Sequence, residues 1–126
     1  MAQRANLPSK LDGRAFVAGT YRATAPFRAD LVDVDRAALR KVDFRRNVVV
    51  AAFRKAPSCG YRLDILRLDR VGRRLTVTIR LKGPPETMNC MAITQPYHVI
   101  AVPRRALRSP LPTRVIVRAL PPISTG

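Results

Sequence analysis

The residues from Tyr61 to Lys82 constrain the fold more than any other stretch, because apolar and polar side chains alternate along them. The runs YRLDILRLD and RLTVTIRLK each place apolar residues on one face and polar residues on the other. The turn sequence DRVGRR, with Gly72, separates the two runs. Period-two alternation on both sides of a turn predicts an antiparallel β-hairpin. The adjacent apolar pair Ile65–Leu66 shifts the phase of the first run, which predicts a β-bulge there.

The segments around the hairpin predict further strands and one short helix. NVVVAAF, beginning at Asn47, is a continuous apolar run rich in β-branched residues, which is typical of a strand buried on both faces. CMAITQPYHVIAVP and TRVIVRAL are two more strand candidates, and Pro96 restricts the first to a sheet edge, a bulge or a break. ADLVDVDRAALRKVDF predicts a short helix near residues 33–42, which Asp33 or Asp35 can cap.

This order of elements predicts the fold class and the domain organisation. One short helix cannot cover both faces of a sheet, so we expect a mainly β protein whose antiparallel sheet folds as a small sandwich or an open barrel. The 126 residues suffice for one domain with its own core. Residues 1–28 are weakly patterned and predict a weakly structured segment, in which RAFVAGTYRA can form one short edge strand. Residues 29–126 then form a single β-rich domain.

The charge balance of the chain is strongly basic. It has 24 Lys and Arg against 8 Asp and Glu, a formal charge of +16, which would attract nucleic acid, anionic lipid or an acidic protein. The cations are spread through strands and loops, a pattern that favours solvated faces over one dedicated patch. Aromatic residues make up 6% and do not interleave with basic ones as in base-stacking platforms. Nucleic acid is therefore a possible partner but not the favoured one.

Candidate catalytic and metal-binding residues are few. Cys59, Cys90 and His98 could supply a thiol and a base, but Cys90 and His98 lie too far apart along one predicted strand for contact, and no third group orients the histidine. Two cysteines and one histidine lack the number and spacing of zinc ligands. Glycine-rich phosphate loops are absent from the sequence. We therefore expect no catalytic residue, no metal, no cofactor and no enzymatic activity.

The two cysteines have a structural alternative. Cys59 precedes one predicted strand and Cys90 begins another, and an even number of cysteines slightly favours a disulfide. In an exported protein this bridge would contribute about 3–4 kcal/mol through loop closure. In a cytosolic protein both would remain thiols, so both states stay open.

The sequence gives limited information on compartment. No run of eighteen or more apolar residues occurs, so we expect no transmembrane segment. The N-terminal residues show no apolar stretch after their basic residues. The protein is therefore expected to be extracytoplasmic (secreted, periplasmic or at the cell surface) if a signal peptide was removed, and otherwise cytoplasmic.

Residues 42 to 105 carry an ordered set of motifs. VDF leads into the β-branched strand, PSCGY forms a turn at 57–61, the hairpin follows, and TQPYHVIAVPR comes after a proline-containing loop. In order and spacing these motifs resemble the C-terminal domain of the protease complex subunit PrcB family. The resemblance implies a small β-rich, usually exported bacterial domain, whose founding member is an accessory subunit of a cell-surface serine protease complex. It implies no catalytic residues, and Cys59 and the +16 charge depart from the family pattern.

The two motif loops form a candidate binding surface. Its residues are Pro57, Ser58, Gly60 and Tyr61 from the first loop, and Gln95, Pro96, Tyr97 and His98 from the second. The same residues also have structural interpretations, since Gly60 can adopt a positive φ and Tyr61 can anchor the core.

We therefore expect a non-enzymatic protein-binding domain, an accessory or stabilising subunit of an extracytoplasmic assembly whose partner is a protease or an acidic surface. The first alternative is a protease inhibitor acting through loops 56–61 and 94–97. The second is a basic module that binds nucleic acid or the cell envelope.

Overall fold

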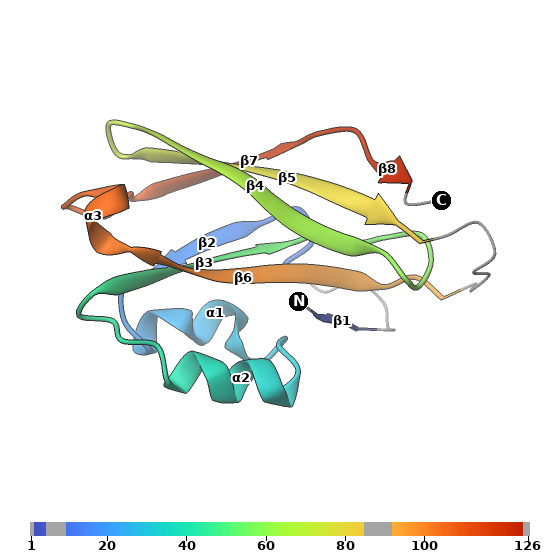
Figure 1. Cartoon of the computed structure of the whole chain (residues 1–126), viewed down its shortest axis with the longest axis horizontal. Helices are drawn as coiled ribbons and strands as arrows, with labels where there is room; N and C mark the ends of the chain where they lie inside the picture. The colour runs from blue at the N-terminus through green and yellow to red at the C-terminus, as the bar shows by residue number, and fades with distance from the viewer. Residues whose placement is uncertain (1, 5–9, 85–91, 125–126) are drawn as a thin grey trace.

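The computed structural model describes residues 2–4, 10–84 and 92–124 and has three layers, two stacked β-sheets and a layer of helices below the first sheet (Figure 1). The first sheet has the order β1–β6–β3–β2, with bounds Ala2–Arg4, Gln95–Pro103, Asn47–Phe53 and Ala15–Ala18. The second has the order β4–β5–β7, with bounds Arg62–Val71, Arg74–Gly83 and Arg114–Ala119, and β8 (Ile123–Ser124) also pairs with β5. The helices are η1 (Arg22–Thr24), α1 (Ala25–Arg28), α2 (Asp33–Arg40) and α3 (Arg104–Leu107).

Strand β3 lies at the centre of these layers, and both of its faces are buried. Its alternate residues point to opposite sides of the sheet. Val48, Val50 and Ala52 pack between the two sheets, while Val49, Ala51 and Phe53 pack against the helices. The prediction that this apolar run is a strand buried on both faces is confirmed.

The predicted hairpin is also confirmed. β4 and β5 pair antiparallel, and Gly72 in the turn adopts a φ of 60°. The register shifts between Ile65 and Arg67, so the bulge lies where the sequence indicated. The inward residues of β5 are Leu75, Val77, Ile79 and Leu81, and all four are buried.

The two sheets form a sandwich that is not closed into a barrel, which confirms the mainly β fold with a short helix and selects the sandwich alternative. The sequence did not predict two parallel strand pairs: β7 and β8 both run parallel to β5. Parallel neighbours require a long crossover. Here the chain leaves β5, passes through β6 in the first sheet and through α3, and then returns to the second sheet.

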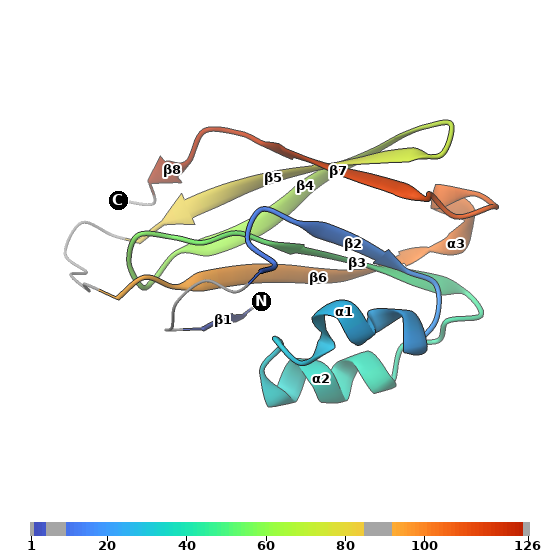
Figure 2. The same cartoon turned by 180° about the vertical axis from the view of Figure 1, so that it is seen from behind.

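The N-terminal residues contain more regular structure than their weak pattern predicted. The short edge strand is confirmed as β2, which pairs with β3 at one edge of the first sheet (Figure 2). η1 and α1 follow it, and Ala18 and Phe27 are fully buried. The division of the chain into residues 1–28 and a domain from residue 29 stays a prediction.

Helix α2 lies within the predicted range, but the predicted capping is wrong. The N-cap residue is Val32, and no side chain caps the helix. Asp33 and Asp35 lie in the first turn, where negative charge favours the helix dipole. Asp33 pairs with Arg36, and Asp35 bonds to a residue of β6 described below, so both carboxylates are engaged elsewhere.

Every helix in the described part of the chain is too short and insufficiently apolar to cross a membrane.

Truncating Phe53 tests the core below β3. Its ring lies 5.5 Å from Tyr97 and 6.1 Å from Phe16 and Phe27, centroid to centroid. We expect Phe53→Ala to lower the free energy of unfolding by about 3–5 kcal/mol, because it leaves a cavity. Val34 is 73% exposed, so Val34→Ala should cost less than about 0.5 kcal/mol. Chemical denaturation measures both values, and equal losses would contradict this description of the core.

Candidate protein-binding surface

The structure places the two motif loops next to each other. Ala56 and Thr94 form an antiparallel bridge, with N–H···O distances of 2.8 Å and 3.1 Å. The Thr94 hydroxyl donates to the carbonyl of Ser58 at 2.8 Å. Gly60 adopts a φ of 85°, as its turn requires. The first loop is therefore held in place by the start of the second.

Three candidate residues of the second loop are buried. Gln95 and Tyr97 are 2% and 1% exposed, and Pro96 is also buried. The prediction that Pro96 lies at a sheet edge, a bulge or a break is wrong, because β6 is continuous there and lies between β1 and β3. The Pro96 carbonyl accepts the N–H of Arg54 at 3.2 Å. The strand therefore lacks only the hydrogen bond that a backbone N–H at residue 96 would donate. Buried side chains offer no surface to a partner.

The first loop is more accessible. Pro57 is exposed, and Ser58, Gly60 and Tyr61 are half-buried. Tyr61 packs against the core between the sheets, as its structural interpretation predicted. A binding role therefore fits this loop better than the buried part of the second, and it stays a prediction.

Tyr97 connects the first sheet to α2. Its hydroxyl accepts the N–H of Val32 at 2.9 Å and donates to Asp35 Oδ2 at 2.6 Å. Burial, together with the hydrogen bond to Asp35, raises the pKa of Tyr97 well above its usual range. The phenol is therefore a neutral donor that anchors the first turn of the helix to β6.

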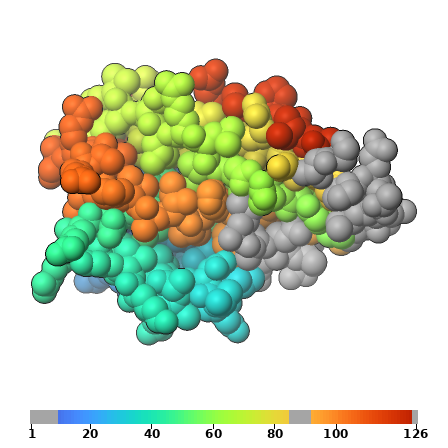
Figure 3. Space-filling model, viewed as in Figure 1, coloured from blue at the N-terminus to red at the C-terminus, as the bar shows by residue number. Residues whose placement is uncertain are grey.

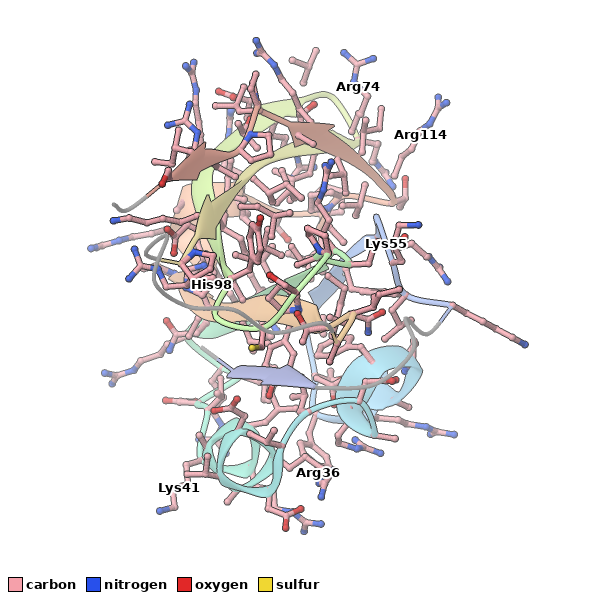
Figure 4. All side chains as sticks on the ribbon, turned by 90° about the vertical axis from the view of Figure 1, so that its right-hand side faces the viewer. Arg36, Lys41, Lys55, Arg74, His98 and Arg114 are labelled. Atoms are coloured by element: carbon pink, nitrogen blue, oxygen red, sulfur yellow. The ribbon has the colours of Figure 1, made fainter. Side chains whose placement is uncertain are left out.

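His98, the next residue of β6, points the other way and connects the two sheets. Its Nδ1 accepts the backbone N–H of Ile65, at the bulge of β4, at 2.8 Å. Figure 4 shows the half-buried ring between the two strands. Burial lowers the pKa of His98, although the charge of Asp64 opposes this. The ring is thus a neutral acceptor bonded to backbone, a structural role.

The remaining candidates add no reactive centre. Cys59 is half-buried in the loop before β4, whereas Cys90 lies outside the described residues, so their bridge stays a prediction. Within the described ranges, no three His, Cys, Asp or Glu side chains lie close enough to hold a metal ion.

An apolar groove between α2 and β6 was not predicted. Val99, Ile100 and Ala101 line it on the strand side, and the Asp35–Tyr97 pair lies among its lining residues. The other lining residues are Ala38, Leu39, Val42 and Val49. Figure 3 shows the face of the molecule on which β6 and the α2 region meet. The only sequence signal for this groove was the uncharged run VIAV, which also fits a core strand.

Beyond Tyr97, the strands that the structure describes leave one edge of β6 unpaired beside this groove. β1 pairs only with residues 95–97, and beyond Tyr97 no described strand pairs with β6 on the side opposite β3. The Pro96 carbonyl faces β3, and backbone groups alternate sides along a strand. The N–H and C=O groups of Val99 and Ala101 therefore face the open side.

This edge lacks the protection of the other long edge strand. β4 carries a bulge and the charged residues Arg62, Asp64, Arg67 and Asp69, devices that discourage strand addition. β2 is also an edge strand, but it has only four residues. Residues 99–102 of β6 combine open backbone groups with apolar side chains and no charge, a combination that favours pairing with another strand.

Comparison with known protein families gives a match. Residues 48–103 match the family described as PrcB C-terminal, which confirms the resemblance found over residues 42 to 105. The match spans β3 to β6 and therefore includes the hairpin, both motif loops and the open edge. No curated protein and no solved structure gave a significant match.

Removing the Tyr97 hydroxyl tests its anchoring role. Tyr97→Phe keeps the ring but leaves the Val32 N–H and Asp35 without their partner. We expect a loss of about 1–3 kcal/mol in the free energy of unfolding, and faster hydrogen exchange in α2. Tyr21→Phe is the control, because the Tyr21 hydroxyl bonds to no described residue. Equal stability of the two variants would contradict the anchoring role.

The stability of the domain should depend on the protonation of His98. Its pKa is lowered in the folded state, so the unfolded state binds the proton more tightly. The stabilising contribution is complete above the unfolded pKa of about 6.5 and declines as the pH falls toward the lowered folded value. His98→Asn, whose Oδ1 can accept the same N–H without titrating, should lose less stability between pH 7.5 and 5.5. Parallel pH profiles from chemical denaturation would refute this.

Proposed function

We propose that this chain, whose residues 48–103 match the PrcB C-terminal family, is a non-enzymatic protein-binding domain, an accessory or stabilising subunit of a protease-containing assembly. The observation that carries the proposal is the uncharged edge of β6 beside the groove of α2, with which no described strand pairs beyond Tyr97. A catalytic role has less support, because Tyr97 and His98 are already engaged in structural hydrogen bonds.

In this proposal, an extended segment of the partner adds to the first sheet beside β6. Its backbone would pair with the outward N–H and C=O groups of Val99 and Ala101. Alternate side chains of the added strand would point toward α2, where the apolar lining favours aliphatic residues. Backbone pairing would supply affinity, and the groove would supply selectivity.

The assembly in this proposal is extracytoplasmic. The usual export of related domains supports that location, and an oxidising compartment would permit the Cys59–Cys90 bridge.

The inhibitor alternative has less support. It requires two loops that enter a partner's groove, but residues 95–97 of the second loop are buried. Only the first loop, with exposed Pro57, remains available for such an insertion.

A pair of matched proline substitutions tests the proposal. In Ala101→Pro, the lost N–H points to the open side of β6, so pairing with β3 is kept while strand addition is blocked. In the control Ala15→Pro, the lost N–H points to the open side of β2, at the opposite edge of the same sheet. Both variants should remain folded, as judged by circular dichroism and thermal unfolding.

The readout is recovery of a protease-containing complex on immobilised protein from the native cells. We expect wild type and Ala15→Pro to recover it equally, and Ala101→Pro to bind at least about tenfold more weakly, because backbone pairing is lost. Undiminished binding by folded Ala101→Pro would contradict the proposed edge. Recovery of no protein partner by wild type would contradict the accessory role itself.

A further inference from the structure

The outer face of the second sheet, which points away from the first sheet, carries cationic side chains on three adjacent strands. On β5 the odd-numbered residues from Leu75 to Leu81 pack inward, so the even-numbered ones point outward. We define the outer face by its charged residues, the cations Arg62, Arg67, Arg74, Arg80, Lys82, Arg114 and Arg118, and the carboxylates Asp64 and Asp69.

The strand register opposes like charges at two places on this face, whereas Arg80 lies across from Asp64. Arg74 lies directly across from Arg114, and Arg62 lies directly across from Lys82. Figure 4 shows Arg74 and Arg114 together on the side of the molecule remote from α2. Like charges directly opposite one another destabilise a sheet. The folded domain therefore gains no stability from these two like-charge pairs.

Arginines elsewhere in the molecule have clear structural roles. Arg36, Arg70 and Arg104 donate to backbone carbonyls and hold loops in place. On the outer face, Arg62 and Arg67 pair with Asp64 and Asp69 at 3.2 Å and 2.9 Å.

The other five cations of the face have no such role. Their side chains form no hydrogen bond or ion pair with any residue that the structure describes. The Nε of Arg80 is buried without a hydrogen-bond partner among those residues. A cation that is partly desolvated and has no partner among the described residues favours an external anion, because burying an uncompensated charge is costly.

We propose that this outer face binds an acidic surface of a partner protein. Arginine forks pair with carboxylates in bidentate geometry, which suits Asp and Glu. Outward residues of a strand repeat about every 7 Å, and carboxylates at alternate positions of an extended acidic segment repeat at the same interval. The described residues of this face include no aromatic ring for base stacking, so single-stranded nucleic acid fits it less well.

This surface is distinct from the open edge of β6. The edge belongs to the first sheet and lies beside α2, whereas the outer face belongs to the second sheet (Figure 1). The two surfaces can therefore be tested independently.

Charge reversal on the face, compared with matched reversal elsewhere, tests the proposal. The face variant is Arg74→Glu, Lys82→Glu and Arg118→Glu, in which two of the new carboxylates oppose Arg114 and Arg62. The control variant is Arg22→Glu, Lys41→Glu and Arg45→Glu, three exposed positions on the helical side with the same change in net charge. The probe is fluorescein-labelled poly-L-glutamate, and its affinity is measured by anisotropy over a series of salt concentrations.

We expect the face variant to bind poly-L-glutamate at least about tenfold more weakly than wild type, and the control to change by less than about threefold. The face variant should unfold at a temperature no lower than wild type, because its new cross-strand pairs are attractive. Equal losses in both variants would overturn the proposal, since only net charge would then matter. Absence of binding by wild type would also overturn it.

Two further probes separate classes of partner. A DNA duplex and vesicles containing phosphatidylglycerol are titrated against the same proteins under the same salt conditions. The proposal predicts that the face variant, compared with wild type, loses no more affinity for DNA or for vesicles than it loses for poly-L-glutamate. A larger loss for DNA or for vesicles would overturn the assignment to an acidic protein and would assign the face to that ligand.

Discussion

The burial of β3 on both faces is the constraint on which the rest of this structure depends. Its alternate side chains supply the core between the sheets and the core under the helices, so neither layer is complete without this strand. Pairing with β3 fixes the register of β6, and places Tyr97 opposite Phe53 and His98 opposite Ala52. The positions of the hydrogen bonds to α2 and to β4 follow from that register.

Adjacent polar residues of β6 connect the three layers, and this use limits what else they can do. Tyr97 bonds to α2 on one side of the sheet, while His98 bonds to the β4 bulge on the other. Arginines serve similar structural purposes by donating to backbone carbonyls, as Arg70 and Arg104 do. Part of the +16 charge is therefore structural. Five cations of the outer face, Arg74, Arg80, Lys82, Arg114 and Arg118, are the part for which the described residues provide no hydrogen bond or ion pair.

Features set by local sequence patterns were predictable from the sequence. Features set by contacts between residues far apart in the sequence were not. The hairpin, its bulge and the doubly buried strand follow from local alternation of side chains. The start of α2 does not follow from local sequence. It depends on Tyr97, whose hydroxyl accepts the N–H of Val32 and which is remote from the helix in sequence. The parallel pairing of β7 depends on a crossover through the other sheet. The two motif loops lie next to each other, but their sequence pattern could not show that Gln95 and Tyr97 are buried.

Residue-resolved hydrogen exchange along β6 tests the central claim, that this strand offers an open edge to a partner, most directly. In the free domain, the amides of Val99 and Ala101 should exchange quickly, while those of Ile100 and Val102, which face β3, should exchange slowly. Addition of the partner complex should slow Val99 and Ala101 specifically. Equal protection of all four amides in the free domain, or no change on binding, would contradict the account.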